Sequence, residues 1–122
     1  MLSPRSERNL QGVHKDLVMV VRLAGKRANF LVTEGLRTVA RQKQLVAAGA
    51  SQTMNSRHLT GHAVDVAALV DGQVRWDWPL YARIADEMKA AAKELNVPII
   101  WGGDWKSLKD GPHFELDRKK YP

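Results

Sequence analysis

Two short segments of the chain contain side chains that can bind a metal ion or transfer a proton. MNSRHLTGHAVDV, residues 54–66, holds two histidines and an aspartate, and DGPHFEL, residues 110–116, holds an aspartate, a histidine and a glutamate. The chain has no cysteine, so a transition metal must be bound by imidazole and carboxylate groups. His58, Asp65 and His113 match the three protein ligands of catalytic zinc, whose fourth position stays open for water. The two segments therefore predict one catalytic zinc ion per chain.

The two histidines of the first segment have other interpretations. Both could be ordinary loop residues, or His58 and His62 could form an HxxxH pair on one face of a helix. The helical interpretation fits badly, because Gly61 lies between them and the sequence alternates as a strand from Ala63 onward. In a strand, Asp65 shares a face with two alanines, where a mostly buried carboxylate needs a cationic partner. His58, seven residues earlier on a turn, can provide that partner.

Hydrophobic periodicity predicts the elements that must position these side chains. Apolar residues at helical spacing predict an amphipathic helix over residues 7–25, on which His14 is a surface or packing residue. Two further helices are predicted, one capped by Thr38 and running to Gly49, and one that begins near Pro79. The expected strands are 30–35 and 63–69, an Asp-Gly hairpin at 71–74, and the short segments 97–103 and 112–116. The predicted fold is α+β, with three helices packed on a small, mainly antiparallel sheet that carries the zinc site.

Length and composition limit the class of protein. With 122 residues, 44% of them hydrophobic and 26% charged, the chain is long enough for one folded domain, residues 1–122, and too short for two ordinary ones. The apolar run LVMVV at 17–21 is flanked by charges and has no cleavage site after it, and no stretch approaches a membrane span. We therefore expect synthesis in the cytoplasm without a signal peptide, no membrane insertion, and a monomer.

The net charge of +6 favours a polyanionic partner. Nucleic acid, anionic lipid and carboxylate-rich cell-wall polymer all carry the complementary charge. A small basic DNA-binding protein is one interpretation, but an aspartate between histidines makes a poor phosphate-binding surface. In addition, no predicted helix has a basic face interleaved with base-reading residues. We therefore expect no nucleic-acid partner.

The order and spacing of these motifs resemble a known enzyme superfamily. SRHLTGHAVDV and DGPHFEL resemble the SxHxxGxAxD and (D/E)xxH motifs of the zinc D,D-carboxypeptidases and L,D-endopeptidases. This superfamily includes phage L-alanyl-D-glutamate endolysins and vancomycin-resistance D,D-peptidases. TEGLRTVARQKQLVAAG, residues 33–49, is similar to its G-x-R-(S/T) segment, and WGGDW, residues 101–105, to its (G/A)-D-W loop. The resemblance extends from Thr33 to Leu116.

The resemblance implies a role for each matching position. The implied zinc ligands are His58, Asp65 and His113. Asp110 falls where the superfamily has its catalytic carboxylate, and Arg37 matches an arginine that stabilises the oxyanion. An ion pair at the start of a helix is the alternative role for Arg37. Ser56 matches a serine near the substrate, whereas His62 is expected at the rim, because a fourth protein ligand would close the water position.

Other residues near the motifs have competing interpretations. Asp104 and Glu115 are the alternatives to Asp110 as the catalytic base, although Glu115 is better placed to orient a ligand histidine. Trp101 and Trp105 are candidate walls of a substrate cleft, with core packing as the alternative.

The implied activity is hydrolysis of peptidoglycan stem peptides at the L-alanyl-D-glutamate bond, as in cell-wall lysis by endolysins. The alternative is a D-alanyl-D-alanine carboxypeptidase or dipeptidase, but a periplasmic carboxypeptidase needs an export signal, and GLRTVA and WGGDW resemble the endolysins more closely. A non-catalytic wall binder would be expected to have lost a ligand or the base, and this chain has them all. We expect action on the cell wall in the periplasm, after release through a holin or another route.

Overall fold

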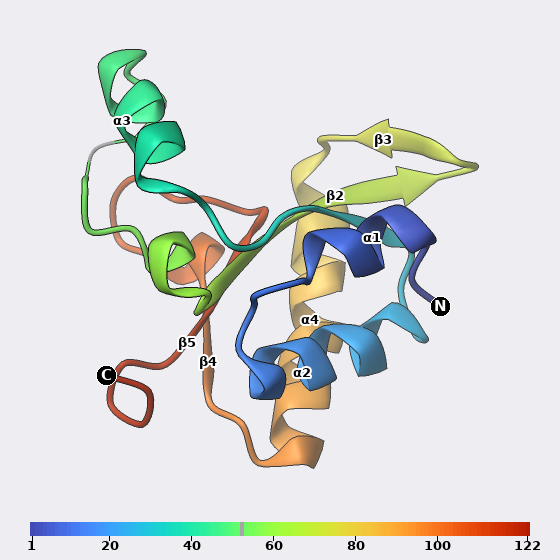
Figure 1. The fold of residues 1–122 in the computed structure, drawn as a ribbon. Helices are drawn as coiled ribbons and strands as arrows, with labels where there is room; N and C mark the ends of the chain where they lie inside the picture. The colour runs from blue at the N-terminus through green and yellow to red at the C-terminus, as the bar shows by residue number, and fades with distance from the viewer. Residues whose placement is uncertain (52) are drawn as a thin grey trace.

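The computed structural model describes residues 1–51 and 53–122, and Figure 1 shows how the chain is arranged. The α-helices are α1 (Pro4–Asn9), α2 (Lys15–Gly25), α3 (Val39–Ala47) and α4 (Trp78–Leu95). The strands are β1 (Phe30–Glu34), β2 (Ala63–Val70), β3 (Gln73–Arg75), β4 (Ile99–Trp101) and β5 (His113–Leu116). Two short 3-10 helices are η1 (Arg57–Thr60) and η2 (Gly102–Asp104).

The strands form one antiparallel sheet in which β2 is the longest and most extensively paired. The order is β1-β2-β5-β4, and β3 pairs with the far end of β2. The register pairs Asp65 of β2 with Glu34 of β1 on one side and with His113 of β5 on the other. These three residues therefore lie abreast across the sheet, although they are far apart in the sequence.

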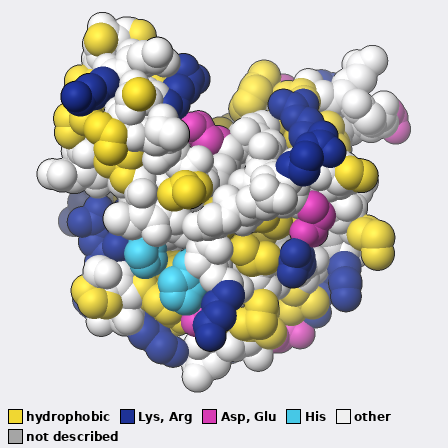
Figure 2. All heavy atoms as spheres, in the orientation of Figure 1, with side chains coloured by type: hydrophobic (Ala, Val, Ile, Leu, Met, Phe, Trp, Pro, Cys, Tyr) yellow, Lys and Arg dark blue, Asp and Glu magenta, His cyan; other side chains and the backbone are white. Residues whose placement is uncertain are grey.

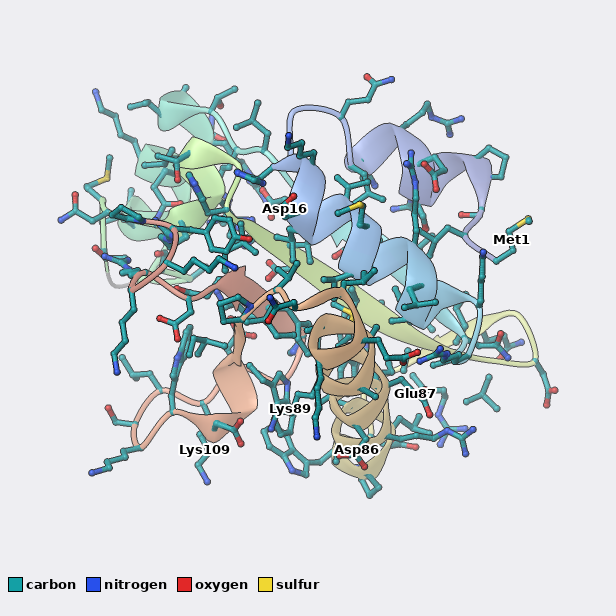
Figure 3. All side chains as sticks on the ribbon, turned by 90° about the horizontal axis from the view of Figure 1, so that it is seen from below. Met1, Asp16, Asp86, Glu87, Lys89 and Lys109 are labelled. Carbon is teal, nitrogen blue, oxygen red and sulfur yellow. The ribbon has the colours of Figure 1, made fainter. Side chains whose placement is uncertain are left out.

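The two faces of β2 have different surroundings, as the alternation of its sequence predicted. Val64, Val66 and Ala68 are buried in the main hydrophobic core. That core also contains the apolar faces of α2 and α4, which lie side by side (Figures 1 and 3). Because successive side chains of a strand point to opposite faces, Asp65 is directed away from this core. Burial of the apolar face thus fixes the direction of the carboxylate.

The prediction of one helix over residues 7–25 is wrong in one respect, because the helix is interrupted between α1 and α2. Gly12 adopts a φ of +83° in this break, a conformation that disfavours other residues. The imidazole of His14 then caps α2 by accepting a hydrogen bond from the backbone N–H of Asp16 at 3.1 Å. Leu10 and Val13 are still buried, so the apolar periodicity continues across the break and hides it from sequence inspection.

The other predicted elements are present, although the strand expected at 97–103 is shortened to β4, because η2 begins at Gly102. Thr38 caps α3 by accepting a hydrogen bond from the backbone N–H of Arg41 at 3.1 Å. Pro79 lies in the first turn of α4, and the Asp71–Gly72 turn joins β2 to β3. The fold is α+β, with the longer helices α2 to α4 as expected and the short α1 in addition. None of the helices within the described residues is long and apolar enough to span a membrane.

Tyr81 joins α4 to the β2–β3 hairpin and gives a direct test of this packing. Its hydroxyl accepts a hydrogen bond from the N–H of Ala68 at 3.1 Å and donates one to the carbonyl of Arg75 at 3.0 Å, and the residue is 2% exposed. We expect Tyr81→Phe to lower the free energy of unfolding by about 1–3 kcal/mol, because the buried N–H of Ala68 loses its hydrogen-bond partner. Urea unfolding measures this change. The control is Tyr121→Phe, which removes a more exposed bond to Asp16 and should have a smaller effect. Equal losses in the two variants would contradict the described packing.

Candidate active site

Three candidate metal ligands from separate elements converge on one point. His58 lies on η1, Asp65 in the middle of β2, and His113 at the start of β5. One potential ligand atom from each lies within 4.8 Å of the other two. The Nε2 atom of His58 is 3.1 Å from Oδ1 of Asp65, and Nδ1 of His113 is 3.2 Å from the same oxygen. The structure thus brings together the three residues that the sequence predicted as ligands.

The second nitrogen of each imidazole is held by an acceptor. Nδ1 of His58 is 2.8 Å from the backbone oxygen of Gly35, and Nε2 of His113 is 2.8 Å from a carboxylate oxygen of Glu115. Since these oxygens can only accept, each outer nitrogen carries a hydrogen. In the neutral imidazoles the inner nitrogens then present lone pairs to the carboxylate of Asp65. Three electron-rich atoms at such distances need a cation between them, so the donor set fits a metal ion.

The same arrangement attracts protons. Burial opposes the charge on Asp65, but hydrogen bonds from His113 and His58 outweigh it and hold the pKa of this carboxyl well below its usual range. Burial also opposes a charged His113, whereas its hydrogen bonds to Asp65 and Glu115 raise its pKa to about 9. A metal ion that binds here must therefore compete with a proton on His113.

The convergence point opens into a cleft of about 700 Å³. Besides the three candidate ligands, the cleft wall includes most of the other residues predicted to act on substrate: Arg37, Ser56, Trp105 and Asp110. Arginine and lysine side chains are spread over the face of the molecule seen in Figure 2 rather than gathered in one patch. The cleft, rather than a general basic surface, is therefore the candidate site.

Asp110 lies on a tight turn immediately before β5. Its backbone N–H donates to the carbonyl of Gly102 at 3.1 Å, and its own carbonyl accepts from the N–H of His113 at 3.2 Å. A Cβ atom on Gly102 would lie 2.3 Å from the backbone oxygen of Asp110, so only glycine allows this approach. Burial and the negative charge of Asp65 raise the pKa of Asp110, which brings this carboxyl nearer to the range useful for proton transfer.

The two alternative bases are engaged elsewhere. Asp104 is exposed and forms an ion pair of 2.7 Å with Lys89, which projects from α4 (Figure 3), and it is not part of the cleft wall. Glu115 lines the cleft, but one of its oxygens is bound to His113. The geometry therefore favours Asp110 as the base and Glu115 as the residue that orients His113.

Arg37 forms the ion pair that was the alternative prediction for it and also lies near the candidate metal centre. Its Nε and Nη2 atoms donate to the two carboxylate oxygens of Glu34 at 2.7 Å each, which is the predicted kind of ion pair at the start of a helix. Nη2 also lies 3.6 Å from Oδ2 of Asp65, at the candidate metal centre. Sequence inspection missed Glu34, because its place beside Asp65 depends on the pairing of β1 with β2.

Ser56 and Trp105 lie close to the two candidate ligand histidines. The hydroxyl of Ser56 accepts a hydrogen bond from the N–H of His58 at 3.2 Å and so caps η1. The ring of Trp105 lies 5.1 Å from that of His113. Both residues also line the cleft.

Trp101 does not lie where a substrate contact requires. Its ring is 8% exposed, belongs to the hydrophobic core and stacks on Phe114 at 6.4 Å. It is not part of the cleft wall, because β4 directs it toward the core. Its indole N–H donates to the carbonyl of Gly111 at 2.7 Å, so Trp101 supports the turn that carries Asp110.

The remaining histidines lie away from the convergence point. His62 follows η1, contacts the hydroxyl of Thr60 at 2.6 Å and has its ring 5.7 Å from that of His14. Because η1 ends at Thr60 and β2 begins at Ala63, no helix carries an HxxxH pair. His62 is also outside the cleft wall, so it is not at the rim that we expected.

A small α+β fold with a His-Asp-His group at an open cleft has the architecture of a metallopeptidase. The sequence profile of the phage L-alanyl-D-glutamate peptidase family matches residues 1–121. The chain therefore belongs to this family.

Individual relatives agree with this assignment. The L-alanyl-D-glutamate peptidase of Escherichia phage T5 is 33% identical over 95% of this chain and 88% of the phage protein. The L-alanyl-D-glutamate peptidase of Listeria phage A118 is 40% identical over 75% of this chain, which spans only 31% of that longer protein. The crystal structure of the Serratia marcescens L-Ala D-Glu endopeptidase ChiX superposes with a TM-score of 0.95 and 55% identity, covering 99% of this chain and 92% of ChiX.

The bond between His113 and Glu115 gives a prediction about metal affinity. We expect Glu115→Ala to weaken zinc binding about 10-fold to 100-fold, because the imidazole of His113 loses the acceptor that fixes its orientation. Competition with a chromogenic chelator measures the affinity. Glu94→Ala is the control, since Glu94 pairs with Arg27 on the surface. Zinc affinity unchanged in Glu115→Ala would show that Glu115 does not orient a metal ligand.

Proposed function

We propose that the chain is a zinc-dependent endopeptidase that hydrolyses the bond between L-alanine and D-glutamate in peptidoglycan stem peptides. The main support is its 55% identity to the Serratia L-Ala D-Glu endopeptidase over 99% of the chain. The names of the T5 and Listeria phage relatives describe the same activity. The net charge of +6 suits a wall polymer rich in carboxylates.

We propose zinc as the metal and His58, Asp65 and His113 as its ligands. Two imidazoles and one carboxylate are a common ligand set of catalytic zinc and leave a position for water. A bound zinc ion would supply a Lewis acid and would lower the pKa of water to about 7. The outer partners Gly35 and Glu115 would keep the inner nitrogens of the two histidines available to the ion.

Asp110 is the proposed general base and acid. It accepts a proton from the attacking water as the oxygen of that water bonds to the carbonyl carbon of L-alanine. It then returns a proton to the amine of D-glutamate as the carbon–nitrogen bond breaks. The raised pKa of Asp110 favours this exchange, and general acid–base catalysis is typically worth ~10²–10⁴-fold in rate.

Arg37 is the proposed donor to the oxyanion. Its guanidinium carries five N–H groups, of which three are used by Glu34 and Gln42. The other two are one on Nη1 and one on Nη2, which also lies 3.6 Å from Oδ2 of Asp65. They are the proposed donors to the carbonyl oxygen of the substrate as its negative charge grows. Ser56 and Trp105, which line the same cleft, are the proposed contacts with the peptide.

All of these side chains come from one copy of the chain. We therefore propose that the enzyme works as a monomer on the cell wall.

The scissile bond is tested by digesting purified muropeptides and weighing the products by mass spectrometry. We expect fragments that end in L-alanine and new peptides that begin with D-glutamate. Loss of a single alanine from pentapeptide stems, with the L-alanyl-D-glutamate bond intact, would instead identify a D-alanyl-D-alanine carboxypeptidase.

The role of Asp110 is tested by Asp110→Asn. We expect kcat to fall at least ~10²-fold, because an amide cannot accept the proton of water, while zinc content and thermal stability stay near those of the wild type. Asp104→Asn is the matched control on the exposed side of the same loop and should retain its rate. An active Asp110→Asn enzyme beside an inactive Asp104→Asn enzyme would show that the base has been assigned to the wrong residue.

A further inference from the structure

Helix α3 is attached to the rest of the molecule in an unusual way. Figure 1 shows α3 standing away from α2 and α4, beyond the end of the sheet. Its one buried residue is polar: Gln42 is 0% exposed, whereas Val39 on the same helix is 56% exposed. Apolar packing therefore contributes little to the position of α3, and the contacts of Gln42 must supply much of it.

Both the oxygen and the nitrogen of the Gln42 amide make hydrogen bonds. Its oxygen accepts from Nη1 of Arg37 at 2.8 Å. Its nitrogen donates to the hydroxyl of Ser51 at 2.8 Å and to the backbone oxygen of Thr53 at 2.5 Å. Arginine can only donate a hydrogen bond, and a backbone carbonyl oxygen can only accept one. The side chain at position 42 must therefore present an acceptor to Arg37 and a donor to Thr53. Among side chains of this shape, only glutamine provides both.

These contacts connect the cleft wall to the candidate metal centre. Ser51 and Thr53 line the cleft on the side of α3. On the other side of Gln42, the guanidinium of Arg37 lies 3.6 Å from Asp65, and the backbone N–H of Arg37 donates to the carbonyl of His58 at 2.9 Å. The buried amide of Gln42 thus connects the cleft wall at Ser51 and Thr53 to the guanidinium of Arg37.

We propose that Gln42 is a positioning residue for the peptidase reaction. Its amide fixes the third contact of the Arg37 guanidinium and so the direction of the N–H groups that would meet the oxyanion. It also holds α3 with Ser51 and Thr53 as one wall of the cleft. The inference rests on the proposed function, because it assigns Arg37 to the oxyanion. Gln42 itself touches neither the metal ligands nor the substrate.

The first test compares two substitutions on the same helix. Gln42→Met removes the acceptor and both donors, whereas Gln44→Met changes an exposed glutamine two positions later. We expect Gln42→Met to lower kcat for stem-peptide cleavage about 10-fold to 100-fold at unchanged zinc content, because a displaced arginine no longer meets the oxyanion. Gln44→Met should match the wild type. A residue with a merely structural role would change stability and leave kcat of the folded enzyme intact, and that result would overturn the proposal.

A double-mutant cycle tests whether Gln42 acts through Arg37. In an Arg37→Lys background, the further change Gln42→Met should reduce kcat by much less than it does alone, because the contact is already lost. If the two substitutions instead reduced kcat by independent factors that multiply in the double variant, the proposal would be overturned. Gln42→Asn, whose side chain is one carbon shorter so that its oxygen is withdrawn from Nη1 of Arg37, replaces Gln42→Met in both tests if the methionine variant does not fold.

Hydrogen–deuterium exchange supplies a readout that does not depend on activity. Amides of α3 should exchange faster in Gln42→Met than in Gln44→Met or the wild type, because the buried anchor is gone. Equal exchange in all three proteins would overturn the anchoring role. If the wild-type chain cleaves no stem peptide, the proposed function fails, and the exchange measurement still decides whether Gln42 holds this wall.

Discussion

The structure of the site depends on a carboxylate that cannot be left without a cation. Asp65 lies on the central strand, and one of its oxygens is within 3.2 Å of a nitrogen from each of two histidines. The apolar residues on either side of it, Val64 and Val66, are fully buried, so the strand cannot rotate to expose the charge. Three side chains from separate elements face this carboxylate: the imidazoles of His58 from η1 and His113 from β5, and the guanidinium of Arg37 from the segment before α3. A divalent metal ion would satisfy this group, and that requirement connects the fold to the proposed chemistry.

Sheet register and short turns convert the sequence into this geometry. Pairing of β2 with β5 places His113 directly beside Asp65, and pairing with β1 places Glu34 on the other side. Glu34 then holds two N–H groups of Arg37, so the arginine faces the metal centre without collapsing onto Asp65. The turn that ends at His113 brings Asp110 into the same cleft, and the close approach of Gly102 and the indole of Trp101 hold that turn in place. Proposed ligands, base and oxyanion donor are thus positioned by backbone pairing, with few flexible connections between them.

Much of this arrangement could be predicted from the sequence, and the failures have a common cause. The candidate ligands could be named because the spacing within each of the two motifs is local and the resemblance to a known superfamily joins the motifs. Strand alternation correctly gave the face of Asp65. The break at Gly12 was missed because Leu10 and Val13 remain in the core on either side of it. Trp101 was placed in the cleft because its motif neighbours are there, but whether β4 directs it inward depends on tertiary packing. Glu34 and Gln42 were missed for a similar reason, since their partners are set by strand pairing and by the chain that follows α3.

The central claim is that one zinc ion binds between Nε2 of His58, the carboxylate of Asp65 and Nδ1 of His113. Anomalous diffraction at the zinc edge, from crystals of the zinc-loaded protein, tests it most directly. We expect a single strong peak about 2.0–2.2 Å from each of these three groups, with Nδ1 of His58 still bonded to Gly35 and Nε2 of His113 to Glu115. A peak at His14 and His62 instead, or zinc bound through the outer nitrogens, would contradict the claim.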